Sequence, residues 1–564
     1  MSPQELPITT AGTCPEQFSD DLFFVKNGWI AGFILGIFLL IGFGLRVGSL
    51  GSESLSEDEL NKLETVVEYR NNGLSGRNGE HPFLMKGLQT VSIAAAEKIN
   101  SILDYPQLSV SPEAALRFPI ALFGTFTALL IFLLVSELFG RSIGLVSAIF
   151  WTLEPIAIAS DRIAKEDSLV VFFFVFTAYF WVRGQTEAER GNQNWTWYAW
   201  TSAAGFAALM ASKYYPHLLS VIAAYYIIFQ SIPATRWRME SARWLKFITI
   251  MGVTFLILNP TILLPETWRE MIKFSSENRI GHDSYEFAGS LYQNRMSAWL
   301  AGVPWTFYYV FIAVKTSLPI FLLFLIGLPV MFRRNLGDGR FLIFFWAFMW
   351  FLPFTFLGGK FTRYFTFVEP VIVIIAATGF YFSVKWLSQS LAGISQIAHY
   401  LQAFLFAVVI AIQLSNALTT APHFRLFTNA IGTSFAPPGW YFPHDEFYDA
   451  ATRETVAAIA SKARLNALIA CETPTLFAHY SRLNNREDLV FVSLSDKAKV
   501  ATLGAEDFIV LTQGRRYFSN SAYVEYLNMP SIQADDLQIN GIVAARITQL
   551  TDTDAKAIRK IANK

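Results

Sequence analysis

Long apolar segments recur along this sequence and alternate with shorter polar ones. A helix that crosses a bilayer needs about 20 consecutive apolar residues. Pro155 and the stretch 213–216 interrupt two of the apolar regions, and a helix is expected to end at each of these points. The pattern predicts an α-helical polytopic membrane protein with about eleven spans, at residues 29–47, 116–138, 142–159, 167–184, 197–212, 215–231, 245–263, 305–331, 341–357, 366–386 and 400–418.

The polar stretch after the first apolar segment has a pattern of its own. Leu60, Leu63 and Val67 recur at helical spacing among charged residues, and residues 83–103 form a second amphipathic run. Both runs predict helices that lie flat on the membrane surface.

The composition changes after about residue 420. Residues 446–463 have the pattern of an amphipathic helix, and short strand candidates occur at 467–470, 490–492, 508–511 and 542–544. Strands that alternate with helices predict a small α/β domain. The expected organisation is therefore a tail at 1–28, a transmembrane catalytic region at 29–419 with external loops at 48–115 and 264–304, and an external α/β domain at 420–564.

Composition supports a membrane protein and argues against several other classes. The chain is 53% hydrophobic and only 16% charged, against about 25% charged residues in soluble domains. Its net charge is zero and it has no long basic run, so a nucleic-acid partner is not expected. Cys14 and Cys471 cannot form a disulfide framework, and the sequence lacks zinc-ligand spacing, so we expect no cofactor and no essential metal.

The distribution of Lys and Arg predicts the orientation in the membrane. One set of loops is richer in these residues than the other, and cytoplasmic loops carry that excess. The N-terminal tail is therefore expected in the cytoplasm, with the apolar run near Trp29 retained as an anchor. The α/β domain and the other helix ends are then expected on the periplasmic or equivalent outer face of the cell membrane.

Ionisable residues in the apolar region fall mostly at the helix ends predicted to face outward. Acidic residues favour helix starts and long cations snorkel at interfaces, so each one alone has a structural explanation. Charge close to hydrocarbon is costly, however, and a cluster of it indicates a functional site. Carboxylates among many cations suggest chemistry on a phosphate-bearing substrate; the cluster comprises Asp58, Glu59, His81, Lys86, Arg117, Arg162, Asp167, Lys213, Lys360 and Arg363.

Six short motifs occur in order along residues 30–390. They are the acidic pair Asp58-Glu59, the segments 81–86, 117–124, 162–168 and 205–213, and the late segment 360–364. In this order they resemble the GT-C glycosyltransferases of the protein O-mannosyltransferase superfamily, which includes bacterial lipid A aminoarabinose transferases. The chain departs from the family pattern at Phe83, which replaces a second proline, and at Asp161, which precedes Arg162.

The resemblance implies a membrane transferase that moves mannose or a related sugar from a polyprenyl-phosphate donor to an acceptor hydroxyl, with inversion. Asp58 would act as general base, and Glu59 would orient it or contact the sugar. Cations bind phosphate oxygens well, and the donor-phosphate candidates are Lys86, Arg117, Arg162, Lys213 and Arg363. Supporting roles are expected for His81, Asp167, Lys360 and Tyr364. His282 and Asp283 would approach the acceptor. The acceptor stays open among a protein, lipid A and another glycan.

Two other classes of membrane protein share some of these features. A polyprenyl-lipid flippase or transporter would also have many spans and charge within the membrane, but transporters often show internal repeats and midplane sites. A receptor with an external α/β domain would leave the Asp58-Glu59 pair without a role.

Overall fold

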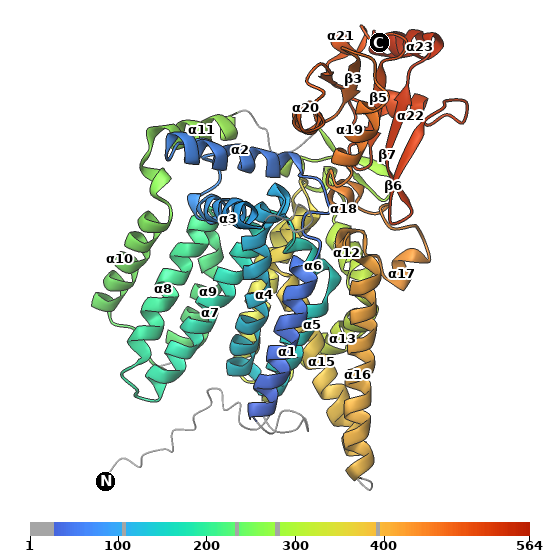
Figure 1. The fold of residues 1–564 in the computed structure, drawn as a ribbon. Coiled ribbons are helices and arrows are strands. Elements are labelled where there is room, and N and C mark those ends of the chain that lie inside the picture. The colour runs from blue at the N-terminus through green and yellow to red at the C-terminus, as the bar shows by residue number, and fades with distance from the viewer. Residues whose placement is uncertain (1–27, 104–108, 232–235, 277–282, 391–394, 564) are drawn as a thin grey trace, which may run out of the picture.

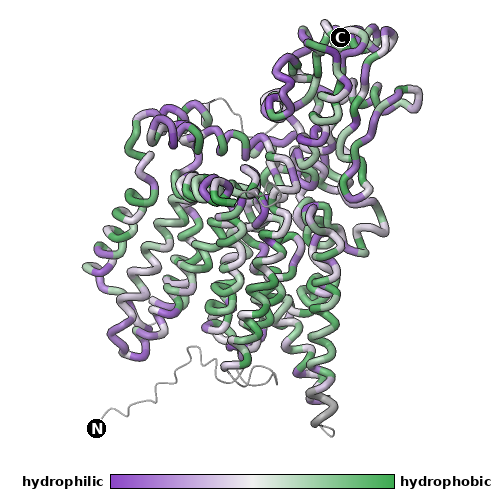
Figure 2. Tube along the Cα trace, in the orientation of Figure 1, coloured by the Kyte–Doolittle hydropathy of each residue, from purple (hydrophilic) through white to green (hydrophobic). Residues whose placement is uncertain are grey.

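The protein is mostly helical, with a small sheet near its C-terminus. The computed structural model describes residues 28–103, 109–231, 236–276, 283–390 and 395–563. Figure 1 shows the long helices side by side, with other helices lying across their upper ends and the sheet above them. Hydrophobic residues dominate the long helices, while hydrophilic ones gather at their ends and in the C-terminal part (Figure 2). This distribution is that of a multi-pass membrane protein.

Within the described residues, seven helices are long and apolar enough to cross a membrane. They correspond to predicted spans, and they are α1 (Gly28–Val47), α4 (Pro112–Phe139), α7 (Asp167–Glu189), α10 (Ser241–Leu258), α14 (Gly339–Phe356), α15 (Glu369–Ser390) and α16 (Ser395–Thr420).

Shorter apolar helices occupy the remaining predicted segments. They are α5 (Arg141–Leu153), α6 (Pro155–Ser160), α8 (Trp195–Ser212), α9 (Leu219–Tyr225), the π-helical turn η4 (Tyr226–Ser231), α12 (Phe307–Lys315) and α13 (Leu318–Val330). Short 3-10 turns connect the elements at η3 (Pro216–Leu218), η5 (Pro260–Leu263), η6 (Met296–Ala301), η7 (Arg334–Leu336), η8 (Thr362–Phe367) and η9 (Phe424–Leu426).

Two predicted spans are each broken into two helices. The segment 142–159 breaks at Glu154, the residue before Pro155, and the segment 305–331 breaks at Thr316 and Ser317 before Pro319. Glu154 directly precedes proline, and such a residue is disfavoured in the helical region. Pro319 lies in the first turn of α13, where proline is tolerated because its missing N–H would have no partner within the helix. The two breaks face each other, because the backbone N–H and hydroxyl of Ser317 both donate to the Glu154 carboxyl group, at 2.8 and 2.5 Å.

The surface helices are α2 (Glu57–Asn72), α3 (Phe83–Ile102) and α11 (Pro265–Ser276), and they cross the ends of the long helices on the side of the sheet (Figure 1). A hairpin of β1 (Ser284–Phe287) and β2 (Ser290–Gln293) lies in the loop predicted at 264–304. Two short helices, α17 (Ala430–Thr433) and α18 (Pro443–Phe447), follow the last long helix.

The C-terminal sheet has five strands in the order β4-β3-β5-β7-β6. The first three are parallel, and the pairs β5–β7 and β7–β6 are antiparallel. The predicted strands correspond to β3 (Leu468–Cys471), β4 (Val490–Ser493), β5 (Phe508–Thr512) and β7 (Ile542–Gln549). The sheet is accompanied by α19 (Thr452–Ala460), α20 (Pro474–Leu483), α21 (Lys497–Val500), α22 (Ser521–Leu527) and α23 (Asp552–Ala562).

Two details of this region differ from the sequence prediction. Strand β6 (Asp535–Ile539) was not predicted, because it lies at the edge of the sheet and most of its residues are exposed. The helix predicted at 446–463 is divided into α18 and α19, because Tyr448 and Asp449 adopt positive φ angles of 44° and 62° between them.

Candidate active site

The first turn of α2 carries three acidic residues, and the local sequence explains why a helix begins there. The hydroxyl of Ser56 accepts the backbone N–H of Glu59 at 3.3 Å, and the Glu59 carboxylate accepts the backbone N–H of Ser56 at 2.9 Å. This reciprocal capping satisfies two otherwise unpaired donors at the start of the helix. It places Asp58 in the first turn, where the helix dipole favours negative charge.

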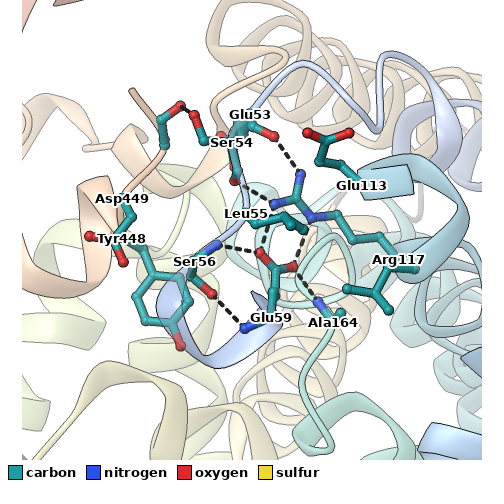
Figure 3. A network of polar contacts seen from close by, with 12 residues as sticks. Glu53, Ser54, Leu55, Ser56, Glu59, Glu113, Arg117, Ala164, Tyr448 and Asp449 are labelled. Carbon is teal, nitrogen blue, oxygen red and sulfur yellow. Dashed lines mark hydrogen bonds and ion pairs between the residues drawn. The ribbon is translucent and has the colours of Figure 1, made fainter. Parts of the chain in front are cut away.

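Glu59 is committed to a buried ion pair with Arg117 of α4 (Figure 3). The guanidinium donates to both carboxylate oxygens, at 2.8 and 2.7 Å. Its remaining donors reach the carbonyls of Leu50, Glu53 and Ser54 at 3.1, 2.9 and 2.7 Å. All five N–H donors of Arg117 are therefore used within the protein.

Glu59 also accepts the backbone N–H of Ala164 at 2.8 Å. Burial alone would raise the pKa of Glu59, but the adjacent guanidinium of Arg117 outweighs it and lowers the pKa. The pair ties α2 to α4 and to the loop before α7. Both side chains are therefore committed to contacts within the protein, and neither is among the residues that line the cavity described next.

A cavity of about 660 Å³, part of it open to solvent, lies beside the start of α2. Its walls come from the ends of membrane helices and from the chain that follows the last long helix. The lining residues are Ile156, Ala159, Ser160, Ile163, Lys165, Asp167, Phe311, Lys315, Thr362, Arg363, Phe365, Thr366, Arg425, Asp445, Glu446 and Tyr448.

Asp58 contacts three residues that line this cavity. Its carboxylate forms an ion pair with Lys165, lies 3.4 Å from the guanidinium of Arg363, and accepts the hydroxyl of Tyr448 at 2.8 Å. The Asp58 side chain is 41% exposed. Burial raises the pKa of Asp58, yet Lys165 and Arg363 outweigh this effect and hold the pKa well below 3.8. Asp58 is therefore ionised at neutral pH.

The cavity carries several cations and several carboxylates. Lys165 is almost buried, and burial lowers its pKa to about 8. Arg425 pairs with Glu53 at 2.5 Å. Burial raises the pKa of Glu53, but Arg425 and His423 outweigh this effect and lower the pKa to about 2. Asp167 pairs with Lys213 at 2.7 Å. Of the sequence-predicted residues, Asp58, Arg363, Asp167 and Lys213 thus gather at or next to the cavity.

Three other predicted cations are bound to backbone carbonyls elsewhere. Lys86 donates to the carbonyls of residues 78 and 81 at 2.8 and 2.9 Å and so closes that loop. Arg162 donates to four carbonyls between residues 45 and 49, at 2.7 to 3.0 Å, and so caps the C-terminal end of α1. Lys360 is buried and donates to the carbonyls of Val303 and Leu357.

The other predicted residues have varied surroundings. The His81 ring lies 3.5 Å from Glu166, and burial lowers the His81 pKa to about 3, so the ring is neutral. Tyr364 lies beside Arg363, whose guanidinium is 5.8 Å from the ring centre. Asp283 accepts the backbone N–H groups of residues 518 and 519 in the C-terminal part, at 3.3 and 3.0 Å. His282 lies outside the described residues.

Several residues that line the cavity were not predicted from the sequence as site residues. Lys165 had a signal, because it lies between two selected positions, Arg162 and Asp167. Arg425, Asp445 and Tyr448 had none, because they belong to no motif and follow the last long helix. Among the described residues, no group of three or more His, Cys, Asp or Glu side chains is placed to hold a metal ion.

Comparison with known proteins places this geometry in context. Residues 106–262 match the family model described as dolichyl-phosphate-mannose-protein mannosyltransferase. The chain is similar to the apo crystal structure of ArnT from Cupriavidus metallidurans, with 12% identity and a TM-score of 0.50 over 92% of this chain and 98% of that one. It is also similar to the Archaeoglobus fulgidus oligosaccharyltransferase tethered with an acceptor peptide, with 11% identity and a TM-score of 0.52 over 86% of this chain and 69% of that one. No curated protein matches the sequence.

Proposed function

We propose that this chain, a member of the GT-C superfamily of membrane glycosyltransferases, transfers a sugar from a polyprenyl-phosphate donor to an acceptor hydroxyl. The transferred sugar is proposed to be mannose or a related sugar, in keeping with the family model that residues 106–262 match. The proposed site faces the outer side of the membrane, and the residues proposed to carry out the chemistry, Asp58, Lys165 and Arg363, lie within residues 29–419. The acceptor is a protein, lipid A or another glycan.

One observation carries this proposal. Asp58 is an ionised carboxylate held by the cations Lys165 and Arg363 at the edge of a cavity. A general base and a pair of phosphate-binding cations are the two components that the reaction needs, and here they touch each other. Charge fixed in a cavity of low dielectric stabilises a developing anion more strongly than the same charge in water.

The donor phosphate is proposed to replace Asp58 as the partner of these cations. Arginine binds phosphate oxygens through paired hydrogen bonds, and lysine acts as a point charge. Once Lys165 and Arg363 turn to the phosphate, Asp58 loses the two charges that hold its pKa down. Its pKa then rises, which makes it a better base when the donor is in place.

The chemical step follows from this exchange. The acceptor oxygen attacks C1 of the sugar from the face opposite the phosphate, and its proton passes to Asp58. The bond between C1 and the phosphate oxygen breaks with its electron pair on oxygen, so the lipid phosphate leaves as an anion. Lys165 and Arg363 stabilise that anion, and the anomeric carbon is inverted. A positioned base typically contributes about 10²–10⁴-fold to the rate.

The remaining predicted residues take supporting roles in this proposal. Lys213 and Asp167 form a second pair, with Asp167 in the cavity wall, and they would orient the sugar or the phosphate. The backbone around the cavity is held, through the contacts described above, by the remaining charged residues Glu59, Arg117, Lys86, Arg162 and Lys360.

The experiment is release of polyprenyl phosphate by purified protein from a panel of polyprenyl-phosphate sugars, with envelope extract as the acceptor source. Asp58→Asn is compared with Glu64→Gln, a matched control on the same helix whose side chain has the same 41% exposure and pairs with Arg77. We expect turnover that selects one sugar, a loss of about 10²–10⁴-fold in Asp58→Asn and little change in Glu64→Gln. Turnover that survives in Asp58→Asn would remove Asp58 as the base. Lipid-linked sugars that bind without turnover would favour a flippase or receptor.

A further inference from the structure

The segment Asp445–Asp449 lies between the cavity and the C-terminal sheet. Tyr448 and Asp449 both have positive φ angles, 44° and 62°, although neither is glycine. Such conformations are uncommon for residues with a side chain and persist where the surroundings impose them. Both residues are buried, at 7% and 5% exposure. The contacts that impose this conformation come from two sides, the cavity and the sheet.

On the cavity side, Tyr448 contacts each charged partner of Asp58. Its hydroxyl donates to Asp58 at 2.8 Å and accepts from Arg363 at 3.4 Å. Two cations lie near the ring, with Lys165 Nζ 5.9 Å and the Arg425 guanidinium carbon 5.6 Å from its centre. Tyr448 therefore contacts Asp58 and three of the cations around it.

On the other side, Asp449 is held by Arg515, which follows strand β5. Two guanidinium nitrogens bind both carboxylate oxygens, one of them at 2.9 Å, and the third nitrogen lies 3.5 Å from the Glu57 carboxylate. Asp449 also accepts the backbone N–H of Glu57 at 3.3 Å. One arginine of the sheet thus reaches both the Tyr448 segment and the first turn of α2.

The loop that carries Arg515 packs closely against the start of α18, and a glycine makes this approach possible. Gly514 has a φ of 82°, and a Cβ atom there would lie 2.4 Å from the carbonyl oxygen of Pro443. A residue with a side chain would push the loop away from α18. Asp445 on α18 in turn accepts the Tyr285 hydroxyl at 2.7 Å and the backbone N–H of Thr362, next to Arg363, at 2.8 Å.

We propose that the C-terminal sheet is part of the catalytic apparatus, with Arg515 and Asp449 as positioning residues that hold Tyr448 against Asp58. This inference rests on the proposed function, because it assigns the sheet a role in that site. A hydroxyl that donates to a carboxylate favours its ionised form. Tyr448 therefore adds to the ionisation of Asp58 that Lys165 and Arg363 already favour and holds the carboxylate beside the cavity, and the sheet sets how firmly Tyr448 is held.

The experiment uses the purified full chain and three variants. Tyr448→Phe keeps the ring and removes only the hydroxyl, so it preserves packing. Arg515→Gln releases Asp449. Arg546→Gln is the matched control, because Arg546 on strand β7, like Arg515, binds both oxygens of an aspartate, here Asp536 at 2.8 and 2.9 Å, but on an exposed face. Two quantities are measured: the pH profile of kcat/KM for the lipid-linked donor, and hydrogen exchange of the backbone over residues 441–451.

We expect the acidic limb of the pH profile to move to higher pH by about one unit in Tyr448→Phe, since a hydrogen bond to a charged group is lost. Arg515→Gln should show the same shift and faster exchange over residues 441–451, and Arg546→Gln should show neither. Unchanged exchange in Arg515→Gln would overturn the inference. An unshifted profile in Tyr448→Phe would also overturn it, provided that Asp58→Asn is inactive. Wild type that turns over no donor would instead overturn the proposed function, and the positioning role with it.

Discussion

Replacing Arg117 with glutamine should destabilise the fold and leave donor recognition unchanged. Its motif position suggests phosphate binding, but the structure commits its five donors to Glu59 and to the carbonyls of Leu50, Glu53 and Ser54. Arg117→Gln therefore leaves Glu59, which is 1% exposed, without its counterion. It also leaves three carbonyls without that donor.

The expected size of this effect follows from burial. Removing one partner of a buried ion pair costs about 3–5 kcal/mol. An unfolding entropy of about 2 cal/mol/K per residue amounts to about 1.2 kcal/mol/K for 564 residues, so the expected fall in Tm is about 3–4 °C. Arg70→Gln is the matched control, because Arg70 lies on α2, the helix of Glu59, and binds both oxygens of Glu97 at 2.6 Å, with the two side chains 35% and 55% exposed. An exposed pair contributes about 0–1 kcal/mol, so this variant should melt close to wild type.

The assay has two parts, thermal unfolding of the purified protein in detergent and the KM for the lipid-linked donor. Arg117→Gln should show this fall in Tm of about 3–4 °C, with a donor KM close to wild type for the protein that remains folded. If Arg117→Gln instead melted like Arg70→Gln and raised the donor KM, Arg117 would face the substrate and the structural role argued here would be wrong.

Two further predictions concern the cavity and its support. Because burial lowers the pKa of Lys165 to about 8 and only the cation attracts phosphate, kcat/KM should fall as pH rises through about 8. Lys165→Arg should move this alkaline fall in kcat/KM to higher pH, since arginine stays protonated. If the fall stayed at the same pH in Lys165→Arg, a group other than Lys165 would be responsible for it. Gly124→Ala should lower Tm, because a Cβ atom there would lie 2.0 Å from Asp161 Cγ, and Asp161 pairs with Arg46. Overpacking of this kind costs about 1–3 kcal/mol, whereas Gly32→Ala, which meets nothing within 4 Å, should have little effect; equal Tm values for the two variants would contradict the packing argument.

The helical architecture follows from the sequence because the apolar period and the prolines are local signals. The spans were predicted in order, and the breaks near Pro155 and Pro319 have a local cause. Strand β6 escaped prediction because its exposed edge position gives it little apolar alternation.

The candidate site was only partly predictable. Arg117 and Arg363 both lie in motif segments. All N–H donors of Arg117 bind acceptors within the protein, whereas Arg363 lines the cavity. A sequence does not distinguish these two cases, because the distinction depends on which carbonyls fold around the guanidinium. Tyr448 reaches Asp58 across 390 positions of the chain, a contact that no local pattern encodes. Arg515 likewise acts through Asp449, and only the folded sheet brings the two together.

The central claim is that Asp58 occupies the place that the donor phosphate takes between Lys165 and Arg363. The most direct test is the Kd of polyprenyl phosphate for wild type and for Asp58→Asn, a substitution that keeps the size and removes the charge. Asp58→Asn should bind polyprenyl phosphate more tightly than wild type, because the competing carboxylate no longer holds the two cations. Equal or weaker binding by Asp58→Asn would contradict it.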